Sequence, residues 1–193
     1  MIEKTARRTG TDSGRRRMPI ARAVSRFFLL LALVPAYLAP FNAAADWTTI
    51  TETAADGTTQ RDSARVTNPE GHSINVQRDS NGVIRGTFSL NGDGTPLDER
   101  SCPTIRIDDQ KPRALAELDG PCEIEDRTAR FTLGVISDGV IQSTLLTQLM
   151  NGKRIFVWHH VKDHGYQETE FTLRGSMQAL MKAMGEQVKV LPQ

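Results

Sequence analysis

The stretch HSINVQRDSNGVIRGTFSL, residues 72–90, decides the fold class of this chain. Apolar and polar residues alternate on both sides of Ser80-Asn81-Gly82, a pattern typical of two β-strands joined by a tight turn. Ile74 and Val76 share one face of the first strand. Gly86 leaves a gap in the apolar face of the second strand. The stretch therefore predicts an antiparallel hairpin with one buried face.

The same alternation recurs on both sides of the hairpin. Residues 54–68 are polar and are expected to form a loop. Further strands are expected at residues 46–53, 104–108, 129–136, 153–161 and 169–173. The segment 153–161 has apolar residues on both faces, which is typical of a central strand covered on both sides.

Two segments near the C-terminus change to a helical period. The first runs from about residue 142 to 150. The second begins at Ser176, expected as its cap, and ends at Gly185. The chain is therefore predicted to be mainly β: a single antiparallel β-sandwich or barrel-like domain of about seven strands, with two short helices near the C-terminus. We expect the domain to span residues 46–185, with 186–193 as a loose tail.

Residues 1–45 indicate export. A basic start precedes an apolar run that is too short to span a hydrocarbon layer of ~30 Å, and small residues precede a cut between Ala45 and Asp46. We expect a cleavable signal peptide with its true start at Met18, and no stable membrane span after cleavage. The arginines at 15–17 leave a twin-arginine export route open as an alternative.

Removal of the leader changes the sign of the net charge. Residues 46–193 contain 16 Lys and Arg against 21 Asp and Glu, whereas the whole chain has a formal charge of +1. A mildly acidic domain without basic clusters argues against nucleic acid or anionic lipid as a partner. The expected location is the periplasm or the medium.

Both cysteines, Cys102 and Cys122, lie in the exported part. In an oxidising compartment they are expected to form one disulfide. The rival interpretation is a metal or redox pair, but their separation fits neither a CxxC motif nor a zinc knuckle.

His159, His160 and His164 with Asp163 form the one group that resembles a metal-ligand set. Neighbouring residues on a strand point to opposite faces, so only one of His159 and His160 could join His164. We therefore expect no metal site. Asp108-Asp109 could suggest paired carboxylates but are expected to form part of a solvated rim. Since no G-x-S-x-G motif occurs, neither a catalytic residue nor a cofactor is expected.

Three segments within residues 83–184 also match family motifs: IRIDD at 105–109, LLTQLMNGK at 145–153 and FTLRGS at 171–176. In this order they resemble the invasion-associated locus B family of exported bacterial proteins. The chain lacks the early cysteine pair often found there. The resemblance implies a small periplasmic or secreted β-sandwich-like domain, linked in a few bacteria to host-cell entry, and implies no catalytic residues.

Taken with the export signal, these patterns favour a non-enzymatic domain that binds a protein or an envelope component. A small-ligand or metal-binding periplasmic protein is one alternative, motivated by the histidines. A cell-wall hydrolase or an inhibitor of one is another, motivated by the compartment and the acidic charge. The partner's identity and the oligomeric state do not follow from the sequence.

Overall fold

The computed structural model describes residues 45–53, 60–92, 94–118 and 120–193. The predicted leader up to residue 44, with Met18, lies outside the described residues. Ala45 and Asp46, on either side of the predicted cut, are both exposed.

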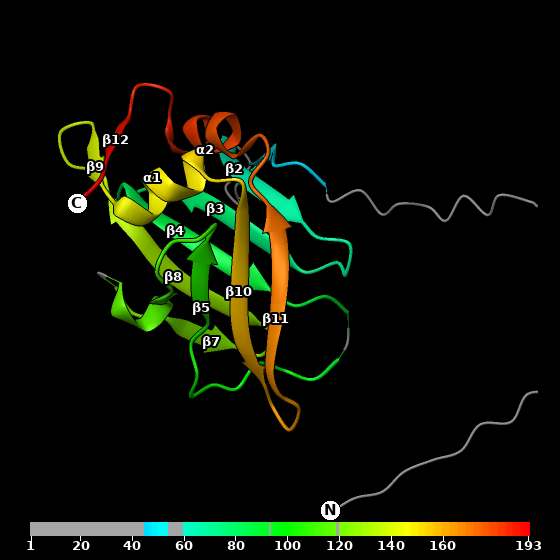
Figure 1. Cartoon of the computed structure of the whole chain (residues 1–193). Coiled ribbons are helices and arrows are strands. Elements are labelled where there is room, and N and C mark those ends of the chain that lie inside the picture. The colour runs from blue at the N-terminus through cyan, green and yellow to red at the C-terminus, as the bar shows by residue number, and fades with distance from the viewer. Residues whose placement is uncertain (1–44, 54–59, 93, 119) are drawn as a thin grey trace, which may run out of the picture. The chain divides into compact units, whose positions relative to one another are not determined.

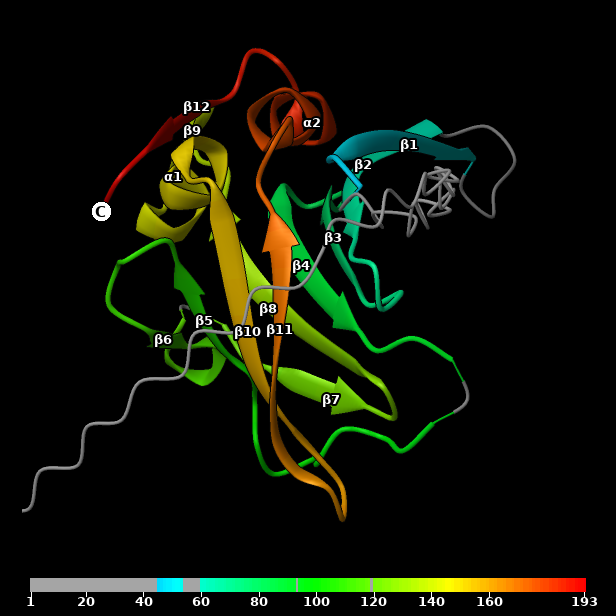
Figure 2. The same ribbon diagram turned by 45° about the vertical axis from the view of Figure 1, so that its right-hand side comes forward.

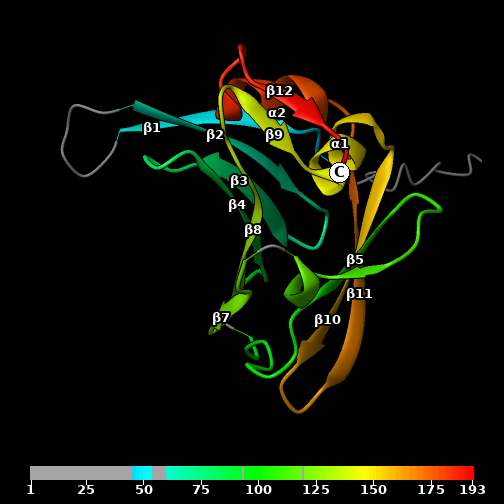
Figure 3. The ribbon, with the colours of Figure 1, turned by 90° about the vertical axis from the view of Figure 1, so that its left-hand side faces the viewer.

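Two antiparallel sheets form the body of the domain (Figure 1). Sheet A has six strands, in the order β1 (Thr48–Thr53), β2 (Gln60–Thr67), β3 (Ser73–Arg78), β4 (Val83–Ser89), β8 (Thr128–Val135) and β7 (Glu123–Glu125). Sheet B has four strands, in the order β11 (Gly165–Thr172), β10 (Arg154–Val161), β5 (Thr104–Ile107) and β6 (Arg113–Ala114). The sheets face one another across the core (Figure 3). They are not joined into one closed sheet within the described residues, so the mainly β, sandwich-like fold is confirmed and the barrel-like alternative is not.

The described residues contain twelve strands, where the pattern predicted about seven. Most of the additional strands have only two or three residues, too few for an alternating pattern. The exception is β2, which lies in the segment expected to be a loop. Its buried positions are filled by Ser63, Ala64 and Val66, so it lacks the large apolar residues by which strands are recognised.

The predicted hairpin is present as β3 and β4. Gly86 stands opposite Phe131 of β8, and a Cβ atom on Gly86 would lie 2.3 Å from the Phe131 ring. The gap in the apolar face is therefore filled by an aromatic ring from the neighbouring strand.

Helices α1 (Thr144–Asn151) and α2 (Ser176–Met184) lie at one end of the sandwich (Figure 1). A short 3-10 turn, η1, covers Leu115–Glu117. Ser176 does not cap α2: Gly175 holds the cap position with φ 81°, while the buried Ser176 hydroxyl donates to the Leu149 carbonyl, 2.7 Å away. Ser176 therefore joins the two helices. No helix among the described residues has the length and apolar character to cross a membrane.

The predicted loose tail requires a correction. β12 (Lys189–Leu191) pairs in parallel with β9 (Val140–Gln142), and Val188 before it is 3% exposed. The Leu191 carbonyl also accepts the Ser143 N–H at 2.7 Å. A single apolar residue among polar ones carries too little pattern to reveal such a strand.

Four non-glycine residues adopt a positive φ between 49° and 64°, and all four are aspartates: Asp108, Asp126, Asp138 and Asp163. Aspartate tolerates the left-handed region better than most residues, because its short polar side chain bonds locally. Each of the four follows or ends a strand, so turns in this fold depend on aspartate as well as on glycine.

Candidate functional site

The residues of the predicted metal-ligand set are separated by the pleat of β10. His159 points between the sheets and is 1% exposed. His160 points outward, with its Nδ1 3.0 Å from Oδ2 of Asp98. His164 and Asp163 lie exposed in the turn between β10 and β11. Within the described part of the chain, no group of three or more histidine, cysteine, aspartate or glutamate side chains is placed to hold a metal ion.

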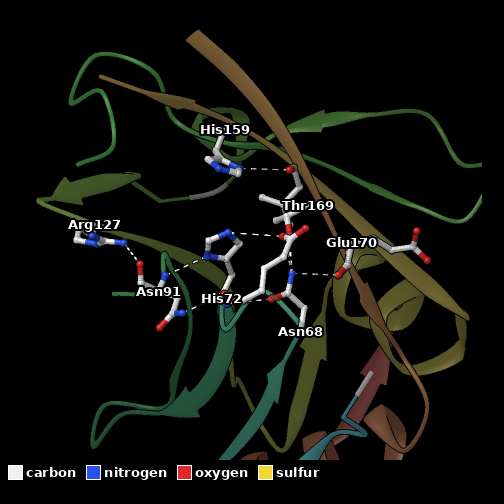
Figure 4. A network of polar contacts seen from close by, with 9 residues as sticks. Asn68, His72, Asn91, Arg127, His159, Thr169 and Glu170 are labelled. Atoms are coloured by element: carbon white, nitrogen blue, oxygen red, sulfur yellow. Dashed lines mark hydrogen bonds and ion pairs between the residues drawn. The ribbon is translucent and has the colours of Figure 1, made fainter. Parts of the chain in front are cut away.

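His159 instead adjoins a polar network that links the two sheets (Figure 4). Its centre is Asn68, a buried residue in the turn between β2 and β3. Asn68 Oδ1 accepts the backbone N–H of His72 at 2.9 Å, and its Nδ2 donates to Thr169 Oγ1 on β11 at 2.6 Å. The Thr169 hydroxyl in turn donates to Glu70 Oε2 at 2.9 Å. The turn of sheet A is thereby fastened to the edge strand of sheet B.

His72 is held in one protonation state by its neighbours. Its Nδ1 accepts the Asn91 N–H at 3.0 Å, so the neutral ring carries its proton on Nε2, 3.6 Å from the Glu70 carboxylate. Burial lowers the pKa of His72, the Glu70 charge opposes this, and the Arg127 charge adds to it. A second proton on the ring would face the Asn91 N–H and displace that hydrogen bond.

His159 is the most deeply buried titratable side chain of this group. Its ring centroid lies 5.1 Å from that of Phe88 and 6.2 Å from that of His72. Nδ1 lies 3.4 Å from the Val157 carbonyl, and Nε2 has no hydrogen-bond partner among the described residues. Burial is the main cause that lowers the pKa of His159, because a charged ring here would be cut off from water.

These groups bond chiefly to one another, so the network serves to hold the sheets together. The nearby apolar cavity between the sheets has a volume of about 10 Å³ and is lined by residues such as Phe88, Phe131 and Val157. That is room for about one water molecule. Neither feature offers space for a small-molecule ligand.

The outer face of sheet B has a different character (Figure 2). Phe156 and Trp158 of β10 lie side by side there, and Arg106 of β5 stands opposite Phe156. The Arg106 guanidinium lies 4.4 Å from the Phe156 ring centroid and 5.4 Å from that of Trp158. Arg154 lies 5.3 Å from the Phe156 centroid. Both contacts lie within the range of cation–π attraction.

Carboxylates and a tyrosine border these rings on the β11 side. Glu168 accepts the Trp158 indole N–H, and Glu170 forms an ion pair with Arg154 at 3.6 Å. Tyr166 is 76% exposed and packs edge-on against His160, with 4.8 Å between ring centroids. We call this surface the aromatic face; it comprises Arg106, Arg154, Phe156, Trp158, His160, Tyr166, Glu168 and Glu170.

The aromatic face is uncovered by any second layer within the described residues (Figure 2). The apolar residues on both sides of residues 153–161 predicted a strand covered twice. β10 is indeed central, between β11 and β5, and its inner face packs in the core. On its outer face, arginine side chains rather than a helix or sheet lie over the rings.

Cys102 and Cys122 form a disulfide, as predicted. Cys102 precedes β5 of sheet B and Cys122 precedes β7 of sheet A. The cystine therefore joins the two sheets through their lead-in segments.

Asp108 has a role that the sequence reasoning missed. Its carboxylate accepts the backbone N–H groups of Lys153 at 3.1 Å and Arg154 at 2.9 Å. It therefore fixes the start of β10 beside the end of β5 rather than forming a solvated rim. Its position directly after a strand, at a turn, was the signal for such a role.

Comparison with known proteins places the fold but not the family. No family model matches the chain, and no curated protein matches it. Among solved structures, the crystal structure of invasion-associated protein B from Bartonella henselae is similar, with a TM-score of 0.50 over 75% of this chain and 95% of that one. The sequence identity is 11%, so the likeness shows a shared fold alone: this chain has the fold of invasion-associated protein B.

Proposed function

We propose that this protein is an exported, non-enzymatic binding domain that holds a protein partner on its aromatic face. The observation that carries the proposal is the composition of that face. Tryptophan, tyrosine and arginine are the residues that most often dominate binding energy at protein interfaces. Here Trp158, Tyr166 and Arg106 lie on one sheet face, with carboxylates at its edge.

Export is supported by three observations of different kinds. The leader has the pattern of a signal peptide, and the cystine suits an oxidising compartment. The described contacts also begin at the predicted cut, since Asp46 forms an ion pair with Arg174 and Trp47 is 5% exposed. A cut after Ala45 would keep both residues. The likeness to invasion-associated protein B fits a role at the cell surface or beyond it.

The absence of enzymatic activity remains part of the proposal. The one histidine–carboxylate pair on the surface is His160 with Asp98, beside a polar hollow of about 410 Å³. We assign this pair to the binding surface, because Tyr166 packs on the His160 ring and extends the aromatic face to the hollow.

The test is a comparative capture experiment with the processed protein as bait and envelope extract as prey. Trp158→Ala removes the central ring and should weaken a partner's affinity by about 2 kcal/mol, roughly 30-fold. The matched control is Val135→Ala, which truncates an apolar side chain that is 54% exposed on sheet A. A partner captured by wild type and Val135→Ala but lost with Trp158→Ala supports the proposal. Equal capture by all three baits, or no enrichment over an unrelated domain, contradicts it.

A further inference from the structure

We infer that two copies of this chain pair edge to edge through strand β11, joining their B sheets into one continuous antiparallel sheet. This inference concerns the edge of sheet B and does not depend on the proposed function of its outer face. It rests on the unused backbone groups of β11 and on the one register that satisfies them.

The first step is to find which backbone groups of β11 are open. The Leu173 N–H donates to the Lys153 carbonyl at 2.8 Å, and the register continues unbroken to the pair Val161–Gly165. In an antiparallel ladder the bonding direction alternates from one residue to the next. The odd-numbered residues of β11 therefore bond to β10, and the even-numbered ones direct their N–H and C=O groups outward. No described strand lies on that outward side.

The second step is that only half of this edge is blocked. The Thr172 carbonyl accepts the Trp47 indole N–H at 2.9 Å, and the Glu170 carbonyl accepts Asn68 Nδ2 at 3.4 Å. Tyr166 and Glu168 have no such cover, and both are exposed. Edge strands are usually protected by lysine, proline or a bulge. β11 contains neither lysine nor proline and pairs with β10 without a register shift.

The third step is the register. A two-fold axis at Gln167 sets Tyr166 opposite Glu168 of the second copy, so that each such pair exchanges both of its backbone bonds. A shift one way sets Glu168 against Glu168, a repulsive pair, and calls on the occupied carbonyl of Glu170. A shift the other way calls on His164, whose N–H already donates to the Val161 carbonyl at 3.1 Å. The register centred on Gln167 uses all the open groups and opposes no like charges.

This register makes a geometric prediction that can be tested with cysteines. Gln167 would face its own copy as a pair without backbone bonds between them, with Cα atoms about 4.5 Å apart, within disulfide range. Glu170 lies on the same strand and is also exposed. Its two copies would lie roughly 20 Å apart along the strands. Gln167→Cys and Glu170→Cys therefore form a matched pair.

The experiment uses the full chain exported to the periplasm, purified with its native cystine. Sedimentation of the wild type at up to about 100 µM should show a dimer, and under mild oxidation Gln167→Cys should form linked dimers at least about tenfold faster than Glu170→Cys. Glu168→Pro removes an outward N–H and should sediment as a monomer with unchanged circular dichroism. A monomeric wild type overturns the inference. A dimer that links both cysteine variants equally fast also overturns it, because it would use another surface.

Discussion

Acidification should destabilise the domain through His159, whose neutral ring is enclosed between the sheets. Burial lowers the pKa of this ring below its ordinary value of 6.5. The folded state therefore binds fewer protons than the unfolded state in the window below pH 6.5. Stability from this group is complete above pH 6.5 and is lost as the pH falls towards the folded-state pKa.

The magnitude follows from proton linkage. An unfolded histidine is about 90% protonated at pH 5.5. If the His159 ring stays neutral in the folded state, lowering the pH from 7.5 to 5.5 costs up to about 1.4 kcal/mol of unfolding free energy. His72 acts in the same direction, because burial lowers its pKa as well.

The assay is urea denaturation of wild type and His159→Leu at both pH values. Leucine has no titrating group, and the ring it replaces makes only a 3.4 Å contact from Nδ1 to the Val157 carbonyl. The variant should lose up to about 1.4 kcal/mol less than wild type on acidification, whatever its stability at pH 7.5. His164→Gln, at an exposed turn position, should behave as wild type does. Parallel pH profiles for wild type and His159→Leu would refute the reasoning.

Three further predictions concern stability and can be measured by the same denaturation method. Asp108→Ala removes the acceptor of two backbone N–H groups and places alanine at φ 49°, so it should cost about 2 kcal/mol; the exposed neighbour Asp109→Ala should cost under about 0.5 kcal/mol, and equal losses would contradict the anchoring role. Replacing both cysteines by serine should cost about 3 kcal/mol, and an unchanged urea midpoint would show that the cystine between the sheets does not constrain the fold. Gly86→Ala forces a methyl group against the Phe131 ring and should cost about 1–3 kcal/mol; a neutral effect would mean that β4 and β8 separate at little cost.

The sequence predicted best where apolar residues alternate over six or more positions. The β3–β4 hairpin, β8 and β10 carry that pattern, and their buried residues, such as Ile74, Phe88 and Val157, are those expected. β2 and β12 were missed because their inward positions hold small or isolated residues that burial alone makes apolar in effect. Those strands are specified by the partner strands beside them, which no local pattern records.

The polar groups were harder to predict than the core. Asn68 and Thr169 are 101 positions apart in the chain, yet their side chains lie 2.6 Å apart. Spacing between them has no meaning until the sheets are stacked. His159 and His160 were singled out correctly as lying on opposite faces, because strand periodicity is local information. Their partners, Phe88 on one side and Asp98 on the other, depend on tertiary structure.

The aspartates at positive φ have a consequence for how this fold changes in evolution. Glycine and asparagine reach the same backbone region as aspartate. Positions such as Asp126 and Asp138 can therefore exchange among the three residue types while the strands on either side keep their register. Asp108 lacks this freedom, because its carboxylate also holds two backbone N–H groups. Among distant relatives we expect the first two positions to drift and the third to keep an acceptor side chain, so that the turn after β5 would mark common ancestry after overall identity has faded.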